Sequence, residues 1–155
     1  MMRLIKYFLL LEIFSFSISN TTYSQATQLG VDVDADFKLA KEMYRKNQYS
    51  LASPLFKQLA FENNNQSKLP VSVQLESRYY SILCGLHLNE ETSEALAKEF
   101  IELEHHTARI QMMSYELANY YFRRKNFIEA NDYYELSGIS NLSNQQIADM
   151  KFKQA

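Results

Sequence analysis

A short helical pattern that recurs along the chain constrains its fold most. The pattern is an aromatic residue, two variable residues and then a small or aliphatic residue, and it begins at Phe37, Tyr80, Tyr115 and Phe152. The starts lie 43, 35 and 37 residues apart. A recurrence of about 35 to 40 residues is typical of stacked helix pairs and not of a single closed globule. We therefore expect an all-α protein, an α-solenoid of antiparallel helix pairs with about three units and the first helix of a fourth.

Composition and charge agree with a helical chain and exclude some classes of partner. Only 3 Gly and 2 Pro occur in 155 residues, so there is little material for hairpins or long loops. The net charge is −2, which is too small and of the wrong sign to attract nucleic acid. The single cysteine, Cys84, excludes an intramolecular disulfide, and its apolar surroundings favour a buried small side chain over a reactive thiol.

The first 26 residues have the features of a secretory signal peptide. Arg3 and Lys6 precede an apolar stretch over residues 7–18 that only Glu12 interrupts, and Ser24-Gln25-Ala26 resembles a small-x-small cleavage site. We expect an exported protein of the periplasm or the outer membrane. An uncleaved membrane anchor remains the alternative. Residues 27–33 are interpreted as a leader, and 34–155 as the repeat domain, which we expect to be the front of a longer array.

The repeat domain alternates helical spacing with local stop signals. Apolar spacing predicts helices around residues 37–44, 49–60, 70–86, 95–103, 107–121, 127–136 and 146–152. The expected turns contain Asn47, the Glu62–Lys68 tract, Asn89 and Lys125-Asn126, and Gly138 fits a helix end. We expect caps at Asp34 or Asp36, at Thr92 or Ser93, and in a Ser143–Gln146 capping box, with Pro54 in a first helical turn.

In this frame the chain resembles the tetratricopeptide repeat family. The first unit has Ala40, Tyr44, Asn47, Tyr49, Ala52 and Phe56, and the third has Ala118, Phe122, Lys125, Phe127, Ala130 and Tyr134. In both units an aromatic residue follows the turn, an alanine comes three residues later, and a second aromatic follows after four more. The second unit is degenerate and keeps Leu83, Ala95 and Leu96. Small residues at these positions let paired helices approach closely.

The resemblance implies a concave groove lined by the first helix of each unit. By position, this partner-binding groove would contain Phe37, Lys41, Tyr44, Arg45, Tyr80, Cys84, His87, Tyr115, Asn119, Phe122 and Arg123. Aromatic rings beside cations suit a bound peptide, because the rings bury area and the polar groups pair with its backbone. The alternative for each aromatic residue is a place in the core between helices, and for the basic residues at helix ends it is compensation of the helix dipole.

The residues give no indication of an enzyme, a metal or a cofactor. His105 and His106 are adjacent, so on a helix they would point about 100° apart and would grip one ion poorly. We interpret them, and the Glu90-Glu91 pair, as exposed turn residues. No glycine-rich phosphate loop, G-x-S-x-G or C-x-x-C motif occurs.

Taken together, the sequence predicts a non-enzymatic protein–protein interaction scaffold of the cell envelope. It would bind protein or peptide segments in the groove and would take no small-molecule substrate and no nucleic acid. One alternative is the periplasmic sensor portion of a membrane signalling protein. Another is a glycan-binding helical protein of the outer membrane, which the absence of Trp disfavours.

Overall fold

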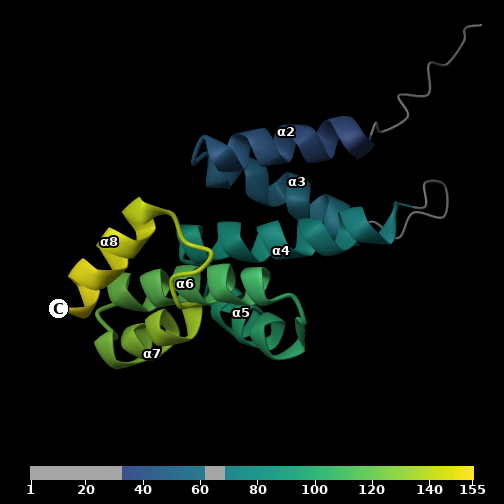
Figure 1. Cartoon of the computed structure of the whole chain (residues 1–155). Coiled ribbons are helices and arrows are strands. Elements are labelled where there is room, and N and C mark those ends of the chain that lie inside the picture. Colours follow the sequence, from purple (N-terminus) through teal and green to yellow (C-terminus); the bar gives the residue numbers. More distant parts are fainter. Residues whose placement is uncertain (1–32, 62–68) are drawn as a thin grey trace, which may run out of the picture. The chain divides into compact units, whose positions relative to one another are not determined.

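The described part of the chain consists of helices joined by short turns. A computed structural model describes residues 33–61 and 69–155, so the expected signal peptide, the leader up to residue 32 and the tract around 62–68 lie outside the described residues. Within the described ranges there are seven helices and no strand (Figure 1). They are α2 (Val33–Arg45), α3 (Tyr49–Phe61), α4 (Val71–Leu88), α5 (Glu91–Leu103), α6 (Thr107–Arg123), α7 (Phe127–Ser137) and α8 (Asn144–Gln154). The predicted all-α class is confirmed.

The turns that the structure describes at residues 47, 89, 125 and 138 form where the sequence predicts them. Asn47, Asn89 and Lys125 follow α2, α4 and α6 with φ of 59°, 57° and 61°, the left-handed conformation that ends a helix. Gly138 follows α7 with φ of 56°. At the start of α8 the Ser143 hydroxyl accepts a bond from the Gln146 backbone N–H, and the Gln146 side chain accepts one from the Ser143 backbone N–H, which confirms the capping box.

Three local predictions were wrong. Helix α2 begins at Val33, so Asp34 and Asp36 lie within it and not at its cap. Pro54 is the sixth residue of α3 and therefore lies in its second turn, where its missing N–H leaves one helical hydrogen bond unmade. Glu90 occupies the N-cap position of α5 without a side-chain hydrogen bond, whereas Thr92 and Ser93 lie inside the helix.

The core consists of side chains from consecutive helices and from alternate ones. Each helix contacts the next along the chain, and α4 additionally contacts α2 and α6. One apolar cluster joins α2 and α3 to Cys84 of α4 through Ala40, Ala52 and Phe56. The larger cluster contains side chains from every helix from α4 to α8 and includes Ala118, Ala130, Tyr120, Tyr134, Leu142 and Met150. The four alanines of the first and third units are at most 1% exposed, as close helix packing requires.

The second unit packs through residues other than those the repeat pattern indicates. Ala95 and Leu96 are exposed, whereas Ser93 and Ala97 are at most 2% exposed. A Cβ built on Gly85 of α4 would lie 1.9 Å from Ser93 Oγ, so α4 and α5 approach closely at this glycine. Ser93 and Ala97 are the third and seventh residues of α5, whereas Ala52 and Ala130 are the fourth residues of α3 and α7, so the buried stripe of α5 is displaced by one position.

Candidate functional site

The side chains that the sequence assigns to the concave groove come from α2, α4 and α6, and we refer to them together as the candidate face. They are Phe37, Lys41, Tyr44 and Arg45 of α2, Tyr80, Cys84 and His87 of α4, and Tyr115, Asn119, Phe122 and Arg123 of α6. The Tyr44 ring of α2 contacts the Tyr80 ring of α4, and Arg123 of α6 donates to the carbonyl of Leu86, the residue before His87 on α4. The set is therefore brought together in space, although its members differ widely in exposure.

On α2, Lys41 joins the first and second units. Its Nζ lies 2.8 Å from Glu76 Oε1 of α4, and it sits 5.3 Å and 5.4 Å from the ring centroids of Phe37 and Tyr80. The hydrogen bond to Glu76 raises the pKa of Lys41. Arg45, one turn further along α2, is exposed, and its Nε donates to the Lys41 carbonyl at 3.4 Å. Lys41 is thus held in place by its neighbours, while the Arg45 guanidinium keeps most of its donors available.

Four aromatic rings form a cluster where α2, α3 and α4 meet. The Tyr44 ring contacts the Tyr49 and Tyr80 rings edge-on, with centroids 5.4 Å and 5.0 Å apart. The His87 imidazole stacks on Tyr49 with centroids 3.9 Å apart and planes 3° from parallel. Burial raises the pKa of Tyr44 above its usual range. These contacts place Tyr44 and Tyr80 mainly in helix packing, the alternative that the sequence left open for aromatic residues.

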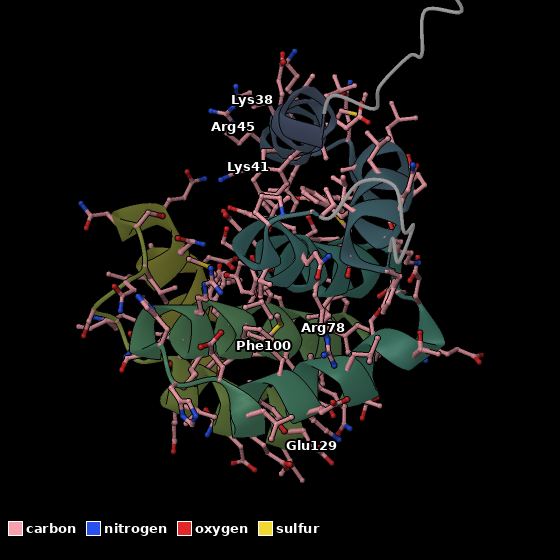
Figure 2. All side chains as sticks on the ribbon, turned by 90° about the vertical axis from the view of Figure 1, so that its right-hand side faces the viewer. Lys38, Lys41, Arg45, Arg78, Phe100 and Glu129 are labelled. Atoms are coloured by element: carbon pink, nitrogen blue, oxygen red, sulfur yellow. The ribbon has the colours of Figure 1, made fainter. Side chains whose placement is uncertain are left out.

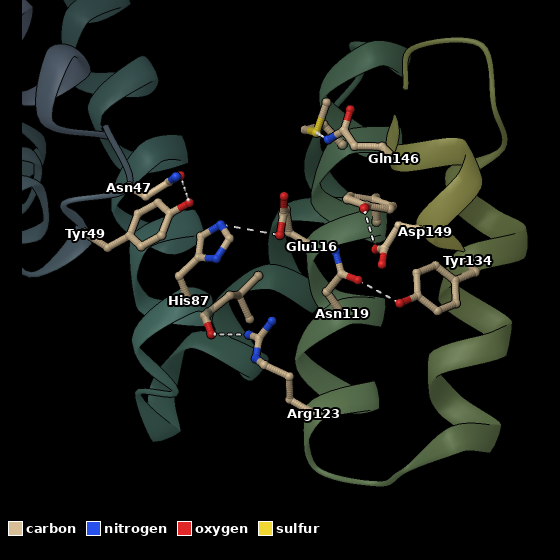
Figure 3. A network of polar contacts seen from close by, with 12 residues as sticks. Asn47, Tyr49, His87, Glu116, Asn119, Arg123, Tyr134, Gln146 and Asp149 are labelled. Carbon is tan, nitrogen blue, oxygen red and sulfur yellow. Dashed lines mark hydrogen bonds and ion pairs between the residues drawn. The ribbon is translucent and has the colours of Figure 1, made fainter. Parts of the chain in front are cut away.

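The central polar contact of the face joins α4 to α6. His87 Nε2 and Glu116 Oε2 lie 3.4 Å apart, and the two side chains are 19% and 11% exposed. Burial raises the pKa of Glu116 to about 7 and, helped by the nearby Arg123 charge, lowers the pKa of His87 to about 4. Between these two pKa values both groups are mainly neutral, so the contact is not a charged ion pair there. Figure 3 shows the pair between Tyr49 and Asn119.

A second polar cluster joins α6 to α7 and α8. Asn119 Oδ1 accepts the Tyr134 hydroxyl at 2.7 Å and Lys153 Nζ at 2.8 Å. Asp149 Oδ2 accepts the Tyr115 hydroxyl at 3.0 Å and Lys153 Nζ at 2.6 Å. Both oxygen acceptors are therefore shared between helices, which fixes α8 against α6.

Arg123 and Phe122 end α6 and connect it to neighbouring helices. Arg123 is exposed, and its Nη2 donates to the Leu86 carbonyl of α4 at 2.8 Å. The Phe122 ring packs edge-on against Phe127 at 5.4 Å, and Lys153 Nζ lies 5.5 Å from its centroid. Arg123 thus links the last turns of α4 and α6.

Sequence reasoning did not single out several residues of this network. Glu116 was recoverable, because it precedes Asn119 by three residues and Arg123 by seven and so shares their side of a helix. Asp149 and Lys153 could have been found in the same way, because they are four residues apart and therefore lie on the same side of α8. The sequence identified Tyr49 and Tyr134 only as aromatic residues of the repeat pattern. Their contacts with His87 and Asn119 come from other helices, and no local sequence pattern indicates such contacts.

Other features of the described residues offer little for chemistry. One cavity of about 260 Å³ lies between α4 and α5, with Leu75, Phe100 and Leu103 in its lining, and another of about 320 Å³ lies beside Phe122 and Lys153. Within residues 33–61 and 69–155 no group of three or more His, Cys, Asp or Glu side chains could hold a metal. Cys84 is buried, and burial raises the pKa of its thiol to about 12, which makes it unreactive.

His105 and His106 are exposed between α5 and α6, as predicted, and their backbone N–H groups donate to Glu104. Among the helices that the structure describes, none has both the length and the apolar character needed to cross a membrane.

Comparison with known proteins gave no assignment. No family model matches the chain, and neither a curated protein nor a solved structure has significant similarity to it.

Proposed function

We propose that this chain is a non-enzymatic binding scaffold built of tetratricopeptide-like helix pairs, and that it holds segments of partner proteins on the candidate face. The proposal takes α2–α3, α4–α5 and α6–α7 as three antiparallel pairs and α8 as the first helix of a fourth. It includes export to the periplasm or the outer membrane, which is inferred from the sequence of residues 1–26.

The observation that carries the proposal is that the first helices of successive units, α2, α4 and α6, contact one another. Tyr44 of α2 contacts Tyr80 of α4, and Arg123 of α6 donates to the Leu86 carbonyl of α4. First helices that contact one another form a layer, and in stacked repeats such a layer offers an extended surface to a partner. The contacts between α2 and α4 and between α4 and α6 support this reading.

The composition of the face supports binding more than catalysis. Its polar groups bond mainly to residues of neighbouring helices, as Asn119 does to Tyr134 and Lys153, which holds their positions without creating a nucleophile. Exposed arginines beside rings are the side chains that contribute most often to protein recognition. No reaction is proposed.

Site-specific photocrosslinking tests the proposal. A benzophenone amino acid placed at Arg45, at Lys38 or, as a control, at Lys151 would be irradiated in the full chain within an envelope extract. Lys151 is exposed on α8 and lies two residues from both Asp149 and Lys153, so it points about 200° away from them. We expect adducts from positions 45 and 38 that Arg123→Glu abolishes, and none of these adducts from position 151. The same adducts from all three positions would reject the candidate face as the binding surface.

A further inference from the structure

We propose that the partner segments held on the candidate face are acidic peptide segments. The inference rests on the proposed binding function and adds the chemistry of the partner. It is carried by the arrangement of charged side chains on α2, α4, α6 and α8, in which carboxylates balance some cations and leave others unbalanced.

Two cations of this region are already neutralised by carboxylates of the chain. Lys41 Nζ lies 2.8 Å from Glu76 Oε1, and Lys153 Nζ lies 2.6 Å from Asp149 Oδ2. An ion pair at such a distance presents little net charge to an incoming group. These two pairs therefore act in positioning α2 against α4 and α8 against α6, and they do not select a partner by charge.

Three other cations have no carboxylate within ion-pair distance among the side chains that the structure describes. Lys38 and Arg45 are exposed on α2, seven residues apart and on the same side of the helix as Lys41, and Figure 2 shows all three projecting from that side. Glu42, close to Arg45, is paired with Lys46 at 2.6 Å. The third cation is Arg123, whose one hydrogen bond within residues 33–61 and 69–155 is to the Leu86 carbonyl.

The acid of the face that remains, Glu116, offsets these cations only in part. It is 9% exposed and faces His87 from α4, Asn119 and Arg123 from its own helix, and Asp149 and Lys153 from α8. Burial raises its pKa to about 7, so near neutral pH the carboxyl carries a fraction of a charge. Among the side chains that the structure describes, the three exposed cations therefore face one unpaired acid, which is buried.

Compensation of helix dipoles does not account for the whole set. Arg45 and Arg123 lie in the last turns of α2 and α6, where a cation is favourable. Lys38 is the sixth residue of α2 and lies far from its C-terminal end. Each of the two guanidinium groups has five N–H donors and uses one of them in a hydrogen bond to the protein. Two parallel N–H groups of each therefore stay free to bind a carboxylate.

A peptide is the acidic partner that the chain favours. The net charge is −2, so a long polyanion such as a nucleic acid would be repelled by the molecule as a whole. A short acidic segment meets only the local field of the three cations. The rings of Phe37 and Phe122 belong to the face, beside Lys41 and Lys153, and can bury the apolar side chains of such a segment.

Fluorescence anisotropy with three labelled peptides tests the inference. The peptides have about 12 residues, alternate Leu with Glu, Gln or Lys, and are acetylated and amidated so that no terminal charge contributes. We expect the full chain to bind the Glu peptide about tenfold more tightly than the Gln peptide and to bind the Lys peptide least. The preference should fall as salt is raised, because exposed charges are screened.

Charge reversals locate the effect. The Arg45→Glu/Arg123→Glu double variant should bind the Glu peptide about tenfold more weakly than the unaltered chain, whereas Lys151→Glu should stay within about twofold. Because Arg123 also bonds to Leu86, Lys38→Glu serves as a second variant whose side chain makes no hydrogen bond or ion pair in the described region. It should weaken binding of the Glu peptide about threefold.

Several outcomes would overturn the inference. Equal affinity for the Glu and Gln peptides would show that the face does not select acidic segments, and crosslinking from positions 38 and 45 would then still support the binding function. An undiminished Glu preference in both Lys38→Glu and the double variant would place the selective charges elsewhere. A single-stranded oligonucleotide of about 12 nucleotides that binds as tightly as the Glu peptide would show selection for negative charge in general.

Discussion

The buried Glu116 carboxyl makes the stability of this protein depend on pH, and Glu116→Gln should remove that dependence. The pKa of Glu116 rises from 4.5 to about 7 on folding because burial disfavours the charged form. At about 1.4 kcal/mol per pH unit, its ionisation opposes folding by roughly 3 kcal/mol above about pH 7. The stability associated with the neutral carboxyl is complete below about pH 4.5 and is lost as the pH rises through 7.

His87 titrates in the opposite sense. Its pKa falls from 6.5 to about 4, so its contribution to stability is complete above about pH 6.5 and is lost as the pH falls through 4. Between about pH 4.5 and 6.5 the two effects oppose each other, and the unaltered protein should show a nearly flat free energy of unfolding. In Glu116→Gln only the His87 effect remains, so stability should rise across that range.

Urea unfolding followed by circular dichroism at about pH 5 and about pH 8 measures the difference. Glu116→Gln should gain roughly 2 to 3 kcal/mol relative to the unaltered chain between the two conditions. Glu129→Gln is the matched control, since Glu129 is exposed on α7, and its effect should stay within about 0.5 kcal/mol at both (Figure 2). A difference between Glu116→Gln and the unaltered chain that is the same at both pH values would refute the reasoning.

Three further substitutions test the packing that positions the face. Gly85→Ala should cost about 1 to 3 kcal/mol because its Cβ would lie 1.9 Å from Ser93 Oγ, and adding Ser93→Gly should recover part of this loss; chemical unfolding of the single and double variants measures both. Tyr134→Phe should cost about 1 kcal/mol in the same assay, since it removes the donor to Asn119 Oδ1. Ser143→Ala should cost about 1 kcal/mol and speed amide hydrogen exchange at the start of α8, because the capping box is lost.

Each of these has a control or a contrary outcome. Ser140→Ala, at an exposed position before α8, should leave exchange in α8 unchanged. A Gly85→Ala chain as stable as the original would mean that α4 and α5 are not in close contact at this point. Equal stability of Tyr134→Phe would indicate that Lys153 alone satisfies Asn119.

Much of the secondary structure could be predicted because it depends on neighbouring residues. Asn47, Asn89 and Lys125 adopt the left-handed conformation at helix ends, and Ser143 and Gln146 form a capping box within one turn. Where local signals compete, prediction was less reliable. Asp36, Thr92 and Ser93 are all good capping residues by type, yet each lies inside a helix. In α5 the helix follows the turn at Asn89 directly, so Glu90 takes the N-cap position.

Helical spacing and the family resemblance led to the prediction of the candidate face but did not indicate the exposure or the partners of its side chains. Of the residues grouped in this way, His87 lies beside Glu116, Asn119 accepts from Tyr134, and Arg123 donates to the Leu86 carbonyl. Nothing local indicated that Tyr44 and Tyr80 would be engaged in ring packing while Arg45 stays exposed. Exposure depends on what a neighbouring helix places opposite each side chain.

The sequence by itself determined the all-helical character, the positions of the turns and the small net charge, because these follow from residue type and spacing along one segment. The tertiary structure decided which alanine of the second unit is buried, that Gly85 accommodates Ser93, and that Glu116 is enclosed beside His87. Those outcomes depend on the distance and rotation between helices that are far apart in sequence. Burial, and with it the pKa of a carboxyl group, is a property of that arrangement and not of the residue alone.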